Sequence, residues 1–488
     1  MTIAWVCEIS ALDPSDNAVT LRFADGALTD TAYYYEPRMK SAAVVYVSPS
    51  DGGVFKIFSS PNIGEIELIN NDGELDIYPD YAVDGRSCKL RLFNDGTFTD
   101  YFIGTIDRLS ERGNSLFLRM KSLTDALQNT HKFSKYGGTN TLPDGVDGVA
   151  TDIKGNVKPK VFGRVKQGAP VFVNTSKGIY QVSDRSTCVI DAVYEAGSAV
   201  TKTAGADYAS LADMLATAPA AGYWKAFQGY FRLGSSAVRT ITFDAHDSNV
   251  LAGDVFESIV VEAGYTMDAT SKAALNAVGE VGIYANSEVS TAQMLDRIIK
   301  SCGAYWYFKN AVVYASLLSL AAVSTMTLYD WSITKIERKS VGGGSNGVPV
   351  TKIKMQADKI ENPQTDLAGA VSAADRARFA EMYRSTEYEN TATLTRHPMA
   401  ETIKIEDGCL RSISDGLTVC TRLLNIFKGR LDIVQVSAAF KEVPTMPDLG
   451  AGITIQTTRL GYDTGKLFTL VGYSLDVRRK TVIMDLIG

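Results

Sequence analysis

The 488-residue sequence has no excess of positive charge, no closely spaced pair of cysteines and no long apolar run. Lysine and arginine number 49 against 55 aspartates and glutamates, so the formal net charge is -6. This balance argues against a protein that binds nucleic acid tightly, because such proteins are usually basic. The longest apolar stretch, residues 314–331, is shorter than a membrane span needs and is interrupted by Ser and Thr. We therefore expect no stable insertion into a membrane.

The N-terminus also lacks the basic and apolar segments of a secretory signal, so we expect a soluble protein made in the cytoplasm. Six cysteines are spread along the chain, at Cys7, Cys88, Cys188, Cys302, Cys409 and Cys420. No C-x-x-C pair occurs, which argues against a zinc knuckle. We expect six free, buried thiols, with disulfides or a metal cluster as the alternatives.

Ser345 is the formal nucleophile of a G-x-S-x-G sequence at residues 343–347. In hydrolases this motif follows a buried hydrophobic strand and precedes a helix. Here the preceding segment, residues 334–340, is charged at four of its seven positions, and Val348 and Pro349 follow the motif. We therefore interpret the sequence as a glycine-rich turn and not as a catalytic site.

The histidines are His131, His246 and His397. They are far apart in sequence, each in a polar neighbourhood, and no H-E-x-x-H sequence indicates a metal site. Residues 69–76 resemble a calcium loop, but its first and twelfth positions would be Leu68 and Pro79, which have no carboxylate. We predict no catalytic residue, no metal and no cofactor. A carboxylate pair for glycosidic cleavage stays open, since such partners need only meet in space.

The first domain, residues 1–135, has the pattern of antiparallel strands. Two β-rich runs surround a Ser-Asp-Gly-Gly turn in residues 44–58, and residues 88–109 repeat this arrangement around an Asn-Asp-Gly turn. The alternating apolar residues Leu116, Leu118 and Met120 predict a further strand with one buried face. We expect an antiparallel barrel or sandwich.

A connecting β-rich domain, residues 136–248, is expected next. Residues 136–156 are polar and glycine-rich, which favours a linker or mobile loop. Residues 208–219 predict one short helix within this domain. At residues 249–335 the apolar period becomes helical, and we expect a small α+β module.

Local signals mark the elements of this α+β module. Ser290 and Gln293 have the spacing of a capping box, and Gly303 stands where a C-terminal cap belongs. A hairpin is expected to follow, with its turn at Lys309-Asn310.

The last domain, residues 336–488, combines helices and strands. Ser372 and Asp375 indicate the start of one helix. The apolar face of the next helix consists of Leu417, Cys420, Leu423, Leu424 and Phe427. Four strands follow, and we expect this helix to pack against the β structure that they form. The last two strands are expected to form a hairpin at Arg478-Arg479 that completes a barrel.

Four passages together resemble the central tail-hub proteins of long-tailed bacteriophages and prophages. They are residues 66–76 with 101–128, residues 159–184 with 229–245, residues 281–308, and residues 449–488. The resemblance lies in their order along the chain. It implies a mainly β fold with an α+β insertion, in which two tube-like β-barrel hub domains are joined by smaller connecting domains.

The resemblance also implies an assembly. Hubs of this type are homotrimers whose six barrels match the hexameric tail tube. The expected partners are distal tail or tube proteins, the tape measure protein, and tip attachment or receptor-binding proteins. The expected location is the virion tail tip, after assembly in the host cytoplasm. Three copies would carry a formal charge of about -18 (three times -6), which would let DNA pass without specific binding.

The sequence leaves two other functions open. One is a receptor- or carbohydrate-binding tail protein, in which the aromatic residues of 304–308 would stack on sugars. The other is a tail-associated cell-wall hydrolase, although trimeric depolymerases usually show a repeat that this sequence lacks.

Overall fold

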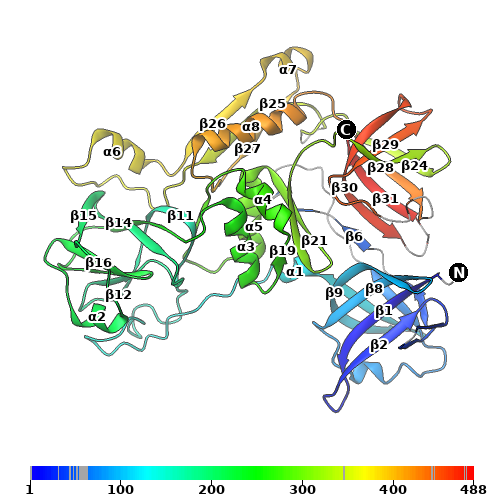
Figure 1. The fold of residues 1–488 in the computed structure, drawn as a ribbon, viewed down its shortest axis with the longest axis horizontal. Coiled ribbons are helices and arrows are strands. Elements are labelled where there is room, and N and C mark those ends of the chain that lie inside the picture. The colour runs from blue at the N-terminus through cyan, green and yellow to red at the C-terminus, as the bar shows by residue number, and fades with distance from the viewer. Residues whose placement is uncertain are drawn as a thin grey trace.

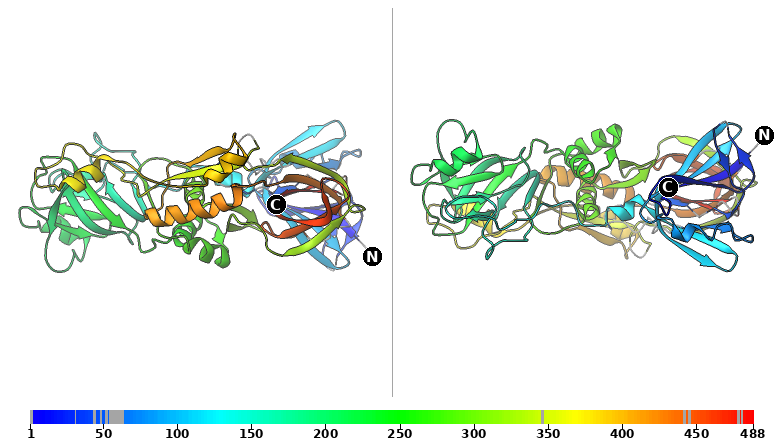
Figure 2. Two further views of the ribbon diagram at one scale, coloured as in Figure 1. Left: turned by 90° about the horizontal axis from the view of Figure 1, so that it is seen from above. Right: turned by 90° about the horizontal axis from the view of Figure 1, so that it is seen from below.

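The computed structural model describes residues 3–30, 32–42, 45–47, 49–50, 53, 64–344, 347–440, 443, 446–476, 479 and 481–488. The fold is mainly β, with 45% strand and 16% helix, as the sequence predicts. Figure 1 shows an elongated molecule with two curved sheets at one end, helices in the middle and a larger sheet at the other end. In both views of Figure 2, the two marked chain ends lie at the end with the two curved sheets.

The first curved sheet is built from the N-terminal part of the chain. Its strands are β1 (Ile3–Leu12), β2 (Ala18–Ala24), β5 (Met39–Ser41), β7 (Glu65–Ile69), β8 (Ser87–Asn94), β9 (Thr97–Arg112) and β10 (Ser115–Ser122), in the order β2-β1-β8-β9-β10-β7-β5. The short pair β3 (Leu28–Thr29) and β4 (Tyr34–Tyr35), the 3-10 turn η1 (Tyr78–Asp80) and helix α1 (Leu123–Ala126) complete this region.

Main-chain bonds bring the two edges of the first sheet together. The edge strand β2 is bridged at Phe23 to Glu36, and the Glu36 main chain exchanges bonds of 2.7 Å with Ala24 and 3.0 Å with Arg22. Glu36 leads directly into β5, the opposite edge. The sheet is therefore a barrel. The predicted Asn-Asp-Gly turn joins β8 to β9, with positive φ at Asp95 and Gly96.

The second curved sheet is built from the C-terminal part. Its strands are β23 (Ser324–Tyr329), β24 (Ile333–Ser340), β28 (Ile433–Ala439), β29 (Gly452–Thr457), β30 (Tyr462–Asp476) and β31 (Thr481–Ile487), in the order β23-β29-β30-β31-β28-β24. The edge strands β23 and β24 are joined by residues 330–332 alone, a connection that spans at most about 14 Å. The edges of a flat six-stranded sheet would be about 24 Å apart. The sheet must therefore curl, so that the connected ends of its edge strands come within about 14 Å of each other, and we call it the second barrel.

The four predicted C-terminal strands are confirmed as β28 to β31, and β31 lies between β30 and β28. Val477 and Arg478, in the predicted turn, lie outside the described residues. The predicted hairpin at residues 44–58 also lies largely outside them. Within it, β6 (Val45–Val47) is described and pairs with β30, so the N-terminal region contributes a strand to the second barrel.

The expected packing of the Leu417–Phe427 helix is wrong. This helix, α8 (Ile413–Phe427), packs on a separate three-stranded sheet of β25 (Val350–Ala357), β26 (Arg384–Glu389) and β27 (Glu401–Ile405). Figure 1 shows it beside these strands and away from the second barrel. Cys420, Leu423, Leu424 and Phe427 are buried, but Leu417 is exposed. Helix α7 (Thr391–Arg396) lies in the same region. Helix α6 (Ala373–Ala380), which Ser372 caps as predicted, lies further away beside the larger sheet, where Phe379 contacts the ring of Tyr194 (Figure 1).

The larger sheet has nine strands. They are β11 (Lys160–Gly168), β12 (Val171–Asn174), β13 (Ile179–Gln181), β14 (Val189–Glu195), β15 (Ser198–Lys202), β16 (Tyr223–Phe227), β17 (Tyr230–Leu233), β18 (Ile241–His246) and β20 (Gly282–Ala285). The predicted short helix is α2 (Leu211–Ala216). Residues 136–156 form no helix or strand, but Tyr136 is buried and donates to Gln181 over 2.6 Å, so this segment is packed against the sheet.

The helical module lies between this sheet and the barrels. It consists of α3 (Ala252–Glu262), α4 (Ala269–Asn276), α5 (Thr291–Cys302), β19 (Thr266–Met267), β21 (Ala304–Lys309) and β22 (Val312–Leu317). The predicted capping box at Ser290 and Gln293 is formed, and Gly303 takes φ 59° at the helix end. The hairpin β21–β22 turns at Asn310 and Ala311.

Candidate functional site

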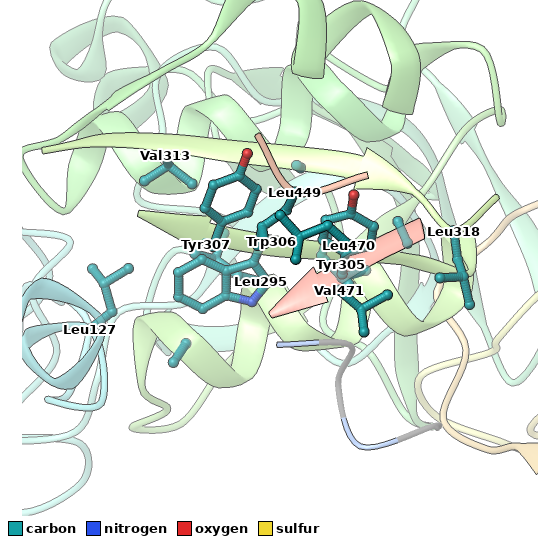
Figure 3. Packing of buried hydrophobic residues seen from close by; sticks show 14 of the residues in the cluster. Leu127, Leu295, Tyr305, Trp306, Tyr307, Val313, Leu318, Leu449, Leu470 and Val471 are labelled. Atoms are coloured by element: carbon teal, nitrogen blue, oxygen red, sulfur yellow. The ribbon is translucent and has the colours of Figure 1, made fainter. Parts of the chain in front are cut away.

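The two barrels and the helical module meet at strand β21. Figure 3 shows Trp306 and its neighbours Tyr305 and Tyr307 packed among apolar side chains of several elements. These are Leu127 after α1, Leu295 of α5, Leu449 before β29, and Leu470 and Val471 of β30. Tyr305, Trp306 and Tyr307 are all buried, so these three rings belong to the core and are not exposed for stacking on a sugar.

A segment from the N-terminal region reinforces this junction. Ser50 exchanges main-chain bonds of 2.8 and 2.9 Å with Trp306, and its Oγ donates to Asp296 Oδ1 over 2.6 Å. The Trp306 indole N–H donates to the same oxygen over 2.7 Å. Burial raises the pKa of Asp296, while these two donors favour its ionised form. The barrel ends are also in direct contact, because Trp5 and Tyr101 both touch the ring of Phe440.

A cavity of about 490 Å³ lies at the same junction. Its lining comes from β8 and β9 of the first barrel, the β21–β22 turn, and the loop that leads into β29. Tyr101, Tyr307 and Tyr473 contribute aromatic walls, and Lys309 pairs with Asp448 at the lining. Because the lining residues come from both barrels and from the β21–β22 turn, a change in the angle between the barrels would alter the packing of these residues.

Each barrel contains a polar cluster around a carboxylate. In the first, Glu8 accepts from Tyr35 Oη over 2.6 Å and from Arg91 over 3.3 Å, and Arg91 also donates to Asp100 over 2.6 Å. Glu8 and Asp100 thus share one arginine. Burial, followed by the bond to Glu8, raises the pKa of Tyr35.

In the second barrel, one carboxylate faces three cations. The side chain of Asp432 is only 2% exposed and lies 2.7 Å from Lys466, 3.2 Å from Arg430 and 3.3 Å from Arg338. Tyr462 Oη also donates to it, over 2.9 Å. Burial opposes its ionisation, but the bonds from Lys466 and Tyr462 prevail and lower the pKa of Asp432.

Another buried carboxylate, Asp358, joins the nine-stranded sheet to the region of α8. It follows β25 with φ 48° and lies 3.0 Å from Lys166 of β11. Arg411, just before α8, is 3.1 Å away, and Arg378 of α6 is 3.2 Å away. No sequence motif marks this residue, since its partners come from distant segments.

The histidines do not form a shared site. His131 is buried, contrary to its polar sequence neighbourhood, and its ring lies 3.0 Å from Thr291 Oγ1 and 3.1 Å from Glu262. Burial, with Lys160 and Arg185 nearby, lowers the pKa of His131 to about 4. His246 pairs with Asp191 over 2.9 Å, and His397 ends α7.

The remaining candidates are Ser345, the six cysteines and the segment 69–76. Ser345 lies outside the described residues. All six cysteines are free and buried, as expected. The residues 69–76 form a turn in which Asp72 and Glu74 pair with Arg38, and the described part of the chain holds no group of three His, Cys, Asp or Glu side chains placed for a metal. No helix among the described residues is long and apolar enough to cross a membrane.

Comparisons with known proteins give only distant likenesses. No family model and no curated protein matches the sequence. The structure is similar to a tail protein from Neisseria meningitidis, with 10% identity, a TM-score of 0.45, and coverage of 100% of this chain and 97% of that one. It is also similar to a 43 kDa prophage tail protein from Shewanella oneidensis, with 9% identity, a TM-score of 0.44, and coverage of 94% and 97%. At these values the likenesses carry no conclusion about function.

Proposed function

We propose that the chain is the central hub of a phage tail tip or baseplate, a structural virion protein without catalytic activity. In this role three copies assemble so that six barrels form a ring. The ring joins the hexameric tail tube to tip proteins of threefold symmetry and surrounds the path of DNA ejection.

The observation that carries this proposal is the pair of barrels in one chain. The first is closed through Glu36, the second is curled by the short connection between its edge strands, and the two contact each other directly through Trp5, Tyr101 and Phe440. A chain with two barrels gives six ring positions from three copies, which is the arithmetic needed to match a sixfold tube to a threefold tip. The sequence resemblance to tail hubs agrees with this arrangement.

The proposed partners follow from the ring. Distal tail or tube proteins would contact one side, and tip attachment or receptor-binding proteins the other, with the tape measure protein reaching the ring from the tube. The formal charge of -6 for each copy disfavours retention of DNA in such a channel.

The test is the mass and symmetry of the purified full-length chain. A trimer has three times 52.8 kDa, about 158 kDa, in sedimentation or native mass spectrometry. Images of the particle should show six density lobes around a central hole. A monomer at all concentrations, also in the presence of its tube protein, would contradict the proposal.

A further inference from the structure

Three sulfur atoms meet inside the first barrel. The Sγ atoms of Cys7 in β1 and Cys88 in β8 are 3.7 Å apart, and the Cys88 thiol donates to Met120 Sδ of β10 over 3.8 Å. Cys7 and Cys88 are fully buried, and Met120 is 3% exposed. The other four cysteines form no such contact between sulfur atoms in the part of the chain that the structure describes. Cys88 therefore lies between two further soft donors.

The pairing of the strands brings these side chains together. The two cysteines are diagonal neighbours in the β1–β8 pair, because Cys7 lies opposite Leu90, two residues after Cys88. On the other side of β8, Cys88 lies opposite Gly104 of β9. Since Gly104 has no side chain, it leaves room for Met120 of the next strand to reach Cys88. The barrel wall therefore holds all three sulfurs in defined positions.

The spacing of the sulfurs is close to that in a metal site. Metal–sulfur bonds of about 2.3 Å, the length in zinc–thiolate sites, place the sulfurs of a three-coordinate site about 4.0 Å apart. The two observed distances, 3.7 and 3.8 Å, are slightly shorter. Small rotations of the side chains would therefore admit an ion between the sulfurs.

The type of donor indicates which ion would bind. Thiolate and thioether sulfurs select soft ions such as copper(I). Zinc also binds thiolates, but its structural sites almost always have four ligands. A fourth ligand is not at hand, since the described residues hold no group of three His, Cys, Asp or Glu side chains placed for a metal, and the sulfurs belong to an apolar core. Copper(I), which accepts three sulfur ligands, fits this donor set best.

Lysines on the outer face of the barrel can balance the charge of such a complex. Copper(I) with two thiolates carries a net charge of -1, which an apolar core alone would disfavour. Lys89 directly follows Cys88, and Lys121 directly follows Met120, so both lysine side chains point to the outer face of their strands. Neither lysine has an ion-pair partner among the described residues. Their positive charges therefore favour an anionic complex on the inner face.

We propose that the first barrel binds one copper(I) ion through Cys7, Cys88 and Met120. Two copper–thiolate bonds and one copper–thioether bond form, and the two thiol protons go to solvent. Copper stays in the +1 state, so no electron is transferred. The ion links β1, β8 and β10 in the barrel interior. The inference does not depend on the proposed hub function, because it rests on three side chains within one copy of the chain.

The test uses the full-length chain, purified without air from cells grown with added copper, so that the ion can enter while the barrel forms. Elemental analysis and native mass spectrometry should find one copper ion per chain. Absorption in the near ultraviolet from copper–thiolate bonds should appear with the metal. Amide hydrogens of β1, β8 and β10 should exchange more slowly than in the chain from cells grown with a copper chelator, because a bound ion stabilises the folded barrel.

Three variants separate this site from copper bound elsewhere. Cys88→Ala should carry no copper, whereas Cys420→Ala, the same change at a buried cysteine of α8, should keep one ion. Met120→Leu, a change of similar volume, should keep the fold and bind copper(I) at least about tenfold more weakly in competition with bicinchoninate.

A wild-type chain without copper, or equal copper in the wild type and Cys88→Ala, would overturn the proposal. So would equal affinity of the wild type and Met120→Leu, and this comparison decides the matter if Cys88→Ala does not fold. Binding of zinc as tight as that of copper(I) would also contradict the proposed site.

Discussion

The two barrels reach the same shape from different arrangements of the chain. The first is made from one continuous region, residues 3–122, and its edges meet through the main chain of Glu36. The second is made from two segments, residues 324–340 and 433–487, which are separated by α8 and its three-stranded sheet. It also takes in β6 from the N-terminal region. The second barrel therefore depends far more on pairing between distant parts of the sequence.

The polar clusters of the two barrels also differ, in the exposure of their carboxylates and in the number of cations around each. Glu8 and Asp100 share Arg91 in the first barrel and keep 17% and 27% of their side chains exposed. Asp432 of the second barrel is nearly inaccessible and serves three cations that come from β24, β30 and the segment before β28. Loss of the central carboxylate should therefore cost the second barrel more than the first.

The largest effect should follow from removal of the last strand. Deletion of residues 480–488 leaves β28 and β30 without the strand between them and removes four buried apolar side chains, Val482, Met484, Leu486 and Ile487. At roughly 1.5–3 kcal/mol each, this loss is comparable with the whole stability of a domain, about 5–15 kcal/mol. We expect the second barrel to unfold while the first stays protected in hydrogen exchange. Full protection of β28 and β30 in the truncated chain would contradict this, and Ile483→Ser, at a half-buried position, is the milder control.

The next largest effect should follow from neutralising the central carboxylate of each cluster, Asp432 or Glu8. Asp432→Asn removes the counter-charge of Arg338, Arg430 and Lys466. Because these cations are partly exposed, we expect a loss of about 2–3 kcal/mol in the stability of the second barrel, as for hydrogen bonds to a charged group. Glu8→Gln leaves Arg91 with Asp100, so the first barrel should lose only about 1 kcal/mol. Hydrogen exchange of peptides from each barrel measures the two losses separately. Equal losses would remove the distinction between the clusters.

A smaller effect should appear on acidification, which should reduce the contribution of Asp432 to the unfolding free energy. Because the pKa of Asp432 is lower in the folded chain than in the unfolded one, its stabilising effect is complete above the unfolded value of about 3.9. The effect is lost as the pH falls through the folded value. The difference in unfolding free energy between the wild type and Asp432→Asn should therefore be constant from pH 7 to pH 5 and shrink below pH 4. Urea unfolding at a series of pH values measures this difference, and a constant value down to pH 3 would contradict the expectation.

Local patterns in the sequence predicted most elements but few of their contacts. The capping box at Ser290, the glycine cap at Gly303 and the strands at the C-terminus depend on neighbouring residues, and all were predicted. The partner of α8 was not, because an apolar face is the same whether it covers a barrel or a separate sheet. The clusters around Asp358 and Asp432 were also missed, since their cations come from distant segments.

The smallest effect should follow from removal of a tyrosine hydroxyl, and here the first barrel should lose more stability than the second. Tyr35 and Tyr462 each donate to the carboxylate of their cluster, over 2.6 and 2.9 Å. Glu8 keeps only Arg91 at 3.3 Å when Tyr35 becomes Phe, whereas Asp432 keeps three cations when Tyr462 becomes Phe.

We therefore expect Tyr35→Phe to cost the first barrel about 1.5–2 kcal/mol, near the value for a charge-assisted bond, and Tyr462→Phe to cost the second about 1 kcal/mol. Tyr34→Phe, at an exposed position next to Tyr35, should change stability by less than about 0.5 kcal/mol. Hydrogen exchange of β1 and β8 reports the first barrel, and that of β28 and β30 the second. A larger loss from Tyr462→Phe would mean that the hydroxyl, and not the set of cations, holds Asp432 in its ionised form.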